Sequence, residues 1–126
     1  APGRHDAPVQ IIDWMPTFCA LAGFKPERDL KWDGVNLWPQ LADGAQPPVR
    51  SLYTVAPGFR ARSFRVGDFK LVLRPQKETE VVELYDLASD PNETTDLATR
   101  LPTKVAELRV ALADYARADK DAVAKD

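Results

Sequence analysis

Cysteine and histidine are almost absent from this sequence, whose 126 residues contain one of each, Cys19 and His5. One cysteine cannot close an intrachain disulfide, so the cysteine count does not indicate whether the protein works in an oxidising or a reducing compartment. A zinc site built from cysteine and histidine ligands is excluded, because such sites take four ligands. A catalytic triad would depend on His5 alone, in a terminal stretch with Gly and Pro. We expect His5 to be a solvated loop residue, and Cys19 to be a buried structural thiol.

Net charge and long apolar runs are lacking as well. The chain has 17 basic and 19 acidic residues, a formal net charge of −2, which gives no positive field for nucleic acid or an anionic membrane. No stretch approaches the roughly 20 apolar residues of a membrane helix, and no signal-peptide pattern opens the chain. We therefore expect neither nucleic acid nor a membrane as a partner. Because Ala1 rather than Met comes first, we expect that an upstream segment has been removed.

Proline is unevenly distributed, and this divides the chain in two. Eight of the 11 prolines fall within the first 58 residues, so short, interrupted elements are expected there. In that part, residues 13–22 predict a short helix, with Asp13 as N-cap and Gly23 as the C-terminal stop. A helical turn is expected at 37–41, closed by Asp43 and Gly44.

The second half is more regular. Strands are predicted at 51–55, 63–66, 69–73 and 81–87, with Gly67 in the first central position of a type II′ hairpin turn. From 102 to 118, apolar residues recur at helical spacing. The fold class predicted is α+β: an irregular, partly helical N-terminal flank and a small four-stranded antiparallel sheet packed with a C-terminal helix.

Charge is clustered in the second half. Residues 51–77 hold six basic side chains and one acidic one, whereas residues 78–126 hold six basic and twelve acidic ones. One interpretation is that the basic hairpin pairs across the sheet with Glu78, Glu80 and Glu83. The other is that the basic residues form a rim that faces an anionic ligand.

The residues supply no recognisable reaction centre or metal site. Neither a P-loop nor a G-x-G-x-x-G pattern occurs. The acidic run from Asp86 to Asp96 has suitable oxygen ligands, but it lacks the central glycine and the spacing of an EF-hand loop. We therefore expect a turn with capping acids there, with no catalytic and no metal-binding residue in the chain.

Five stretches, in order, resemble the C-terminal portion of the type I sulfatases, of the alkaline-phosphatase-like superfamily. Residues 6–23 are similar to D-x-P-V-x-x-x-D-x-x-P-T-x-x-x-x-A-G, and residues 33–41 to D-G-x-x-L-x-P-x-L. Residues 65–71 resemble R-x-G-D-(W/F/Y)-K-L. Residues 83–98 resemble E-L-Y-D-L-x-x-D-P-x-E-x-x-N-L-A, with Asp96 where the family usually has Asn. The helix around 105–108 fits as well.

The resemblance implies a parent enzyme that hydrolyses sulfate esters, with calcium and a formylglycine made from Cys or Ser in a C/S-x-(P/A)-x-R motif. Residues 19–23 are not that motif, because Gly23 stands in place of the arginine. The family's metal ligands and catalytic Lys and His lie upstream of the matched segment. The chain alone is therefore expected to be inactive, serving packing and a role at the substrate mouth.

The resemblance also implies the domain organisation and the partners. Residues 1–50 are expected to be the trailing segment of the missing catalytic α/β domain, and residues 51–126 the small C-terminal subdomain. If Met15, Phe18, Leu37 and Trp38 face outward, they expose apolar patches that a monomer rarely tolerates. The expected partners are the missing N-terminal catalytic domain and, in the intact enzyme, a sulfated small molecule or glycan.

Arg60 and Arg62 are the candidate substrate-binding residues, because a guanidinium suits a sulfate or carboxylate. The alternative for each is a surface arginine paired with Glu80 or Glu83. Two other functions remain open: the C-terminal part of a phosphonate or phosphodiester hydrolase of the same superfamily, and a stand-alone module that binds acidic glycans. Localisation is unknown, although many bacterial sulfatases are exported to the periplasm or beyond.

Overall fold

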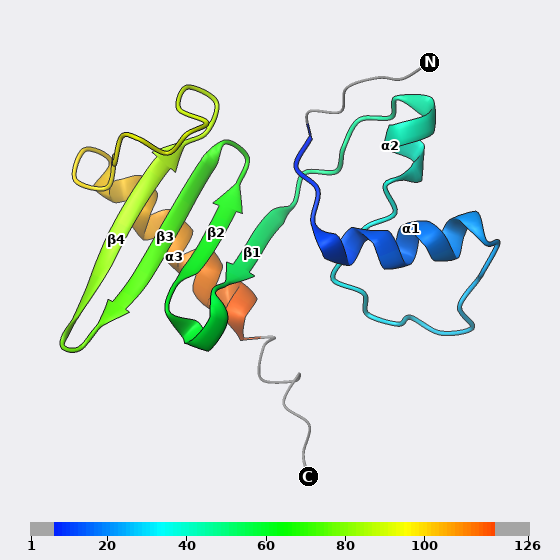
Figure 1. Cartoon of the computed structure of the whole chain (residues 1–126), viewed down its shortest axis with the longest axis horizontal. Coiled ribbons are helices and arrows are strands. Elements are labelled where there is room, and N and C mark those ends of the chain that lie inside the picture. The colour runs from blue at the N-terminus through cyan, green and yellow to red at the C-terminus, as the bar shows by residue number, and fades with distance from the viewer. Residues whose placement is uncertain (1–6, 118–126) are drawn as a thin grey trace, which may run out of the picture. The chain divides into compact units, whose positions relative to one another are not determined.

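The computed structural model describes residues 7–117 (Figure 1). The chain divides into two compact units, with the boundary between Pro48 and Val49. We call them the first unit and the sheet unit, and each is described by itself. His5 lies outside the described residues, so its predicted position in a solvated loop stays a prediction.

The first unit consists of short helices joined by irregular chain. The 3-10 turn η1 (Ile11–Asp13) leads directly into α1 (Trp14–Leu21), and α2 (Trp38–Asp43) follows after a long loop. Gly44 ends α2 in the left-handed conformation, with φ +66°, where a residue without a Cβ is least strained. The short helices predicted in this part of the chain are confirmed.

The sheet unit is an antiparallel sheet of four strands in the order β1-β2-β3-β4, followed by one helix (Figure 1). Its elements are β1 (Ser51–Val55), β2 (Arg62–Val66), β3 (Phe69–Gln76), β4 (Thr79–Asp86) and α3 (Pro102–Ala116). A short 3-10 turn, η2 (Pro57–Phe59), lies between β1 and β2. The predicted α+β class, with its four-stranded sheet and C-terminal helix, is confirmed.

The β2–β3 hairpin has the expected tight turn. Val66 pairs with Phe69, and Gly67 between them takes φ +58°. This is the φ that the first central position of a type II′ turn requires, and it favours glycine. The turn sets the register of the hairpin, and so decides which side chains share a face.

One face of the sheet carries the core of this unit. Phe64, Leu71 and Leu84 lie opposite one another on β2, β3 and β4, and each is at most 1% exposed. Leu108 and Leu112 of α3 complete the cluster, so α3 covers this face (Figure 1). None of the helices within residues 7–117 combines the length and the hydropathy that a membrane span requires.

Candidate functional site

A buried polar cluster holds the first unit together. The Asp13 carboxylate is fully buried and accepts hydrogen bonds from the backbone N–H groups of Gln10 (2.7 Å) and Val35 (3.0 Å). The Thr17 hydroxyl donates to the carbonyl oxygen of Asp13 (2.7 Å) and accepts from the N–H of Leu37 (2.8 Å). These bonds fasten the loop before α2 to the start of α1.

Two expectations about this region are wrong. Asp13 does not cap α1 with its side chain, because its carboxylate is already occupied by the N–H groups of η1 and of the loop. Leu37 does not face outward, since it is only 1% exposed. Burial of Leu37 follows from the bond between its N–H and Thr17, which draws the residue against α1.

Apolar side chains, in contrast, lie on the surface of the first unit. Phe18 is 59% exposed and stacks on Trp14, with 5.6 Å between the ring centroids. Cys19 is half-buried rather than buried, and its Sγ lies 4.0 Å from Sδ of Met15. We call the exposed apolar residues of this unit its apolar surface. Its members are Val9, Ile11, Ile12, Trp14, Met15, Phe18, Leu21, Phe24, Leu30, Trp32, Trp38 and Leu41.

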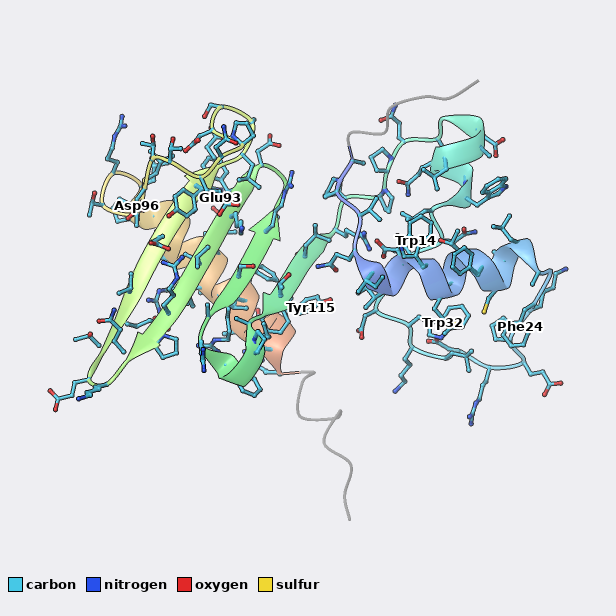
Figure 2. The ribbon with its side chains drawn as sticks, in the orientation of Figure 1. Trp14, Phe24, Trp32, Glu93, Asp96 and Tyr115 are labelled. Carbon is cyan, nitrogen blue, oxygen red and sulfur yellow. The ribbon has the colours of Figure 1, made fainter. Side chains whose placement is uncertain are left out.

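This distribution is the reverse of what a self-sufficient small domain shows. Asp13, Thr17 and Gln40 are buried, whereas Leu37 is the one large hydrophobic residue buried among the described residues of this unit. Figure 2 shows Trp14, Phe24 and Trp32 among the side chains around α1 and the loop after it. Exposed apolar area of this extent is typical of protein–protein interaction sites and ligand grooves.

The structure separates the two candidate arginines of the sheet unit. Arg62 lies on β2, where its guanidinium is 3.7 Å from the Glu80 carboxylate of β4. Arg109 of α3 contacts the same carboxylate at 2.5 Å. Arg60 is exposed in the loop between β1 and β2, and makes no ion pair with any carboxylate of residues 7–117. Arg62 thus pairs with Glu80, as in the alternative to a substrate-binding role. Arg60 has no such partner within residues 7–117.

Other cations of the hairpin are paired too. Arg74 forms an ion pair with Glu83, and the hydrogen bond that its guanidinium donates to that carboxylate raises the pKa of the guanidinium. Lys70 contacts Glu93 at 2.6 Å. The interpretation that the basic hairpin pairs with the acidic strand is confirmed for Glu80 and Glu83.

The acidic loop after β4 is tied to the sheet by its own side chains. Oδ1 of Asp96 accepts hydrogen bonds from the N–H of Leu84 (3.0 Å) and of Ala98 (2.8 Å). Glu93 takes φ +55° and reaches Lys70, and Figure 2 places it with Asp96 in this loop. Two of the motifs that carried the resemblance therefore meet here, since Lys70 belongs to one and Glu93 to the other.

Asp90 stabilises the turn in that loop. Its carboxylate accepts the N–H groups of Thr95 and Thr94, each at 2.8 Å, and the Thr94 hydroxyl at 3.0 Å. These bonds, that from Thr95 foremost, lower the pKa of Asp90. Within residues 7–117, no group of three His, Cys, Asp or Glu side chains is placed to hold a metal ion.

The lowered pKa of Asp90 predicts a stability loss in acid. Because the folded state favours the carboxylate, its stabilisation is present above the unfolded pKa of about 3.9 and is lost as the pH falls below it. We expect the free energy of unfolding of the native chain to fall more between pH 5 and pH 3 than that of Asp90→Asn. Urea titrations across this range measure it, and parallel curves would contradict the assignment.

Sequence reasoning missed two features of these surfaces. Gly34 touches the backbone of η1 so closely that a Cβ would lie 2.1 Å from the carbonyl oxygen of Ile12. The Asp33-Gly34 pair signalled a turn, but nothing in the sequence indicated what it would touch. Phe59 is 70% exposed with φ +53°, and no local pattern predicted an aromatic residue in that conformation.

Comparison with known proteins gives these surfaces a context. No family model matches the chain. Arylsulfatase K of Xenopus laevis is 26% identical over 121 residues, which are 86% of this chain and 22% of that protein. A choline-sulfatase of Rhizobium meliloti is 35% identical over 105 residues, or 78% of this chain and 19% of that protein. The chain resembles the C-terminal portion of a sulfatase.

A solved structure supports the same relationship. It is described as a complex of a protein with its substrate D-glucosamine-2-N,6-O-disulfate, and it is 25% identical with a TM-score of 0.63. The match covers 86% of this chain and 24% of that one. The chain spans about a fifth of the length of the two curated relatives, arylsulfatase K and the choline-sulfatase.

Proposed function

We propose that this chain serves as the C-terminal part of a sulfatase. In this role it contributes the apolar surface of the first unit for association and the loop between β1 and β2, with Arg60, close to the substrate. It contributes no catalytic residue. The observation that carries the proposal is the apolar surface of the first unit, together with the alignment to about a fifth of two sulfatases. The occupant of that surface is the catalytic domain of the same sulfatase, which would supply the calcium ion and the formylglycine.

The burial pattern supports that occupant. A domain that stood alone would bury Met15 and Phe18, since each buried side chain of this size contributes about 1.5–3 kcal/mol. Instead, a buried carboxylate and hydroxyl hold α1 with these residues outward. Such a buried, hydrogen-bonded polar cluster fixes one conformation, and so presents a shaped apolar surface to a partner.

The intact enzyme would hydrolyse sulfate esters. The substrate class we propose is a sulfated small molecule or sugar, as for the relative described with a disulfated glucosamine. Since the resemblance places the nucleophile and metal ligands upstream of the matched segment, the 126-residue chain should not turn over 4-nitrophenyl sulfate, with or without calcium. Calcium-dependent release of 4-nitrophenol by the pure chain would overturn the proposal.

A second test addresses the apolar surface itself. The native chain should self-associate in sedimentation velocity, and should enhance the fluorescence of the apolar dye ANS. Replacing Met15 and Phe18 together with Glu should reduce dye fluorescence at least threefold and give a monomer, because charge opposes burial of this surface. Val110, 64% exposed on α3, gives the matched control as Val110→Glu. Equal effects of both changes would contradict the assignment.

A further inference from the structure

Backbone hydrogen bonds close the loop between β1 and β2. The N–H of Ala56 donates to the carbonyl oxygen of Ala61 (2.9 Å), and the N–H of Phe59 donates to that of Ala56 (3.0 Å). Between them, Gly58 has φ +67° and Phe59 has φ +53°. The chain thus places two successive residues in the left-handed region to make this turn.

Phe59 is an unusual residue for that conformation. A bulky side chain with positive φ is an outlier, because its Cβ crowds the backbone. Burial of the ring does not compensate, since Phe59 is 70% exposed. The loop's backbone bonds would form equally well with Gly or Asn, which adopt this conformation at lower cost. Strain of this kind is concentrated at functional sites.

Arg60 follows directly and has a different environment from its neighbours. Arg62 and Arg74 each contact a glutamate, as does Lys70. Arg60 is exposed and contacts no carboxylate in the part of the chain that the structure describes. Within residues 7–117, its guanidinium is therefore not held by a carboxylate, and it follows the exposed Phe59 directly in the chain.

We propose that Phe59 and Arg60 form a binding site for a ring that bears a sulfate or carboxylate group. The Phe59 face would pack on the ring, and the Arg60 guanidinium would donate paired hydrogen bonds to the anionic oxygens. This inference rests on the proposed function for the nature of its ligand, and it adds Phe59 as the group that recognises the ring. Arg62 is not part of this site, because it pairs with Glu80 on the face of the sheet that α3 covers.

The ring can come from a sugar or from an aryl group, and two probes separate these sources. The full chain, labelled with nitrogen-15, is titrated with N-acetylglucosamine 6-sulfate and with 4-nitrophenyl sulfate. Unsulfated N-acetylglucosamine controls for the charge. We expect the sulfated sugar or the aryl sulfate, and not the neutral sugar, to shift the amide signals of residues 58–61 in a saturable way. The probe that binds more tightly identifies the source.

Variants then test the two side chains. Phe59→Ala and Arg60→Ala should each weaken binding at least fivefold, whereas Lys77→Ala, which removes another exposed cation, should leave it unchanged. Phe59→Gly distinguishes a binding role of Phe59 from a structural role. It should lose binding while its Tm stays equal to the native value or rises by a few degrees, because glycine relieves the strained φ.

Three results would overturn the site. The first is that none of the probes shifts the amides of residues 58–61. The second is that neutral and sulfated sugars bind equally. The third is that Phe59→Gly lowers Tm by several degrees, which would make Phe59 a residue of the fold. These results test the site alone. The proposed function is tested separately, by the turnover assay on the chain and by its association through Met15 and Phe18.

Discussion

Replacing Phe64 with Ala is expected to remove most of the free energy of unfolding of the sheet unit. The Phe64 ring is 1% exposed at the centre of the sheet, 5.7 Å from the Tyr115 ring between their centroids. Removing such a ring costs about 3–5 kcal/mol, because transfer energy is lost and a cavity remains. A unit of this size is stable by about 5 kcal/mol, at the low end for folded proteins.

Urea unfolding followed by far-UV circular dichroism measures this loss. Val110→Ala is the matched control, since Val110 lies on the exposed side of α3, the helix that covers Phe64. That variant should shift the midpoint only slightly. A Phe64→Ala midpoint as close to native as that of the control would mean that α3 does not close the core as described.

The sheet unit was predictable because its information is local. Alternation of apolar and polar residues gives each strand its face, and the Gly67-Asp68 turn sets the β2–β3 register. The helix period of α3 was equally clear, with Leu108 and Leu112 on the buried side. Antiparallel neighbours joined by short loops leave few other ways to pair.

The first unit was less predictable, because its contacts join residues far apart in sequence. Asp13 was expected to cap the helix beside it, but its carboxylate binds the N–H of Val35, 22 residues later. The same holds for Thr17 and Leu37, separated by 20 residues. No helical or strand periodicity encodes such bonds, so the sequence could not show that Leu37 points inward.

The two arginines show the same limit at the candidate site. Arg60 and Arg62 are two residues apart in a basic stretch, and the same substrate-binding role was predicted for both. Register separates them: Arg62 opposes Leu73 on β3 and so lies on the face that Glu80 shares. Arg60 precedes β2, so the alternation of side chains between the two faces of the sheet does not fix its direction. Their roles as substrate-binding residues remain predictions, for which Arg60 now has the better position.

Replacing Gly34 with Ala should release the loop that the buried polar cluster holds. An added Cβ would lie 2.1 Å from the carbonyl oxygen and 2.5 Å from the carbonyl carbon of Ile12. These are backbone atoms, so no change of rotamer relieves the clash. The loop must move away, which breaks the bond from the Val35 N–H to the buried Asp13 carboxylate. Leaving a buried acceptor short of a donor costs about 1–3 kcal/mol.

Hydrogen exchange of the Val35 and Leu37 amides reads this out directly. We expect protection to fall about 100-fold, equivalent to about 2.7 kcal/mol. Gly23→Ala separates a clash from simple φ strain, because Gly23 has φ +72° but no atom within 4 Å of the added Cβ. That control should change the exchange of these two amides by less than fivefold. Unchanged protection in Gly34→Ala would mean that the polar cluster does not hold the loop, and that another force keeps Met15 and Phe18 on the surface.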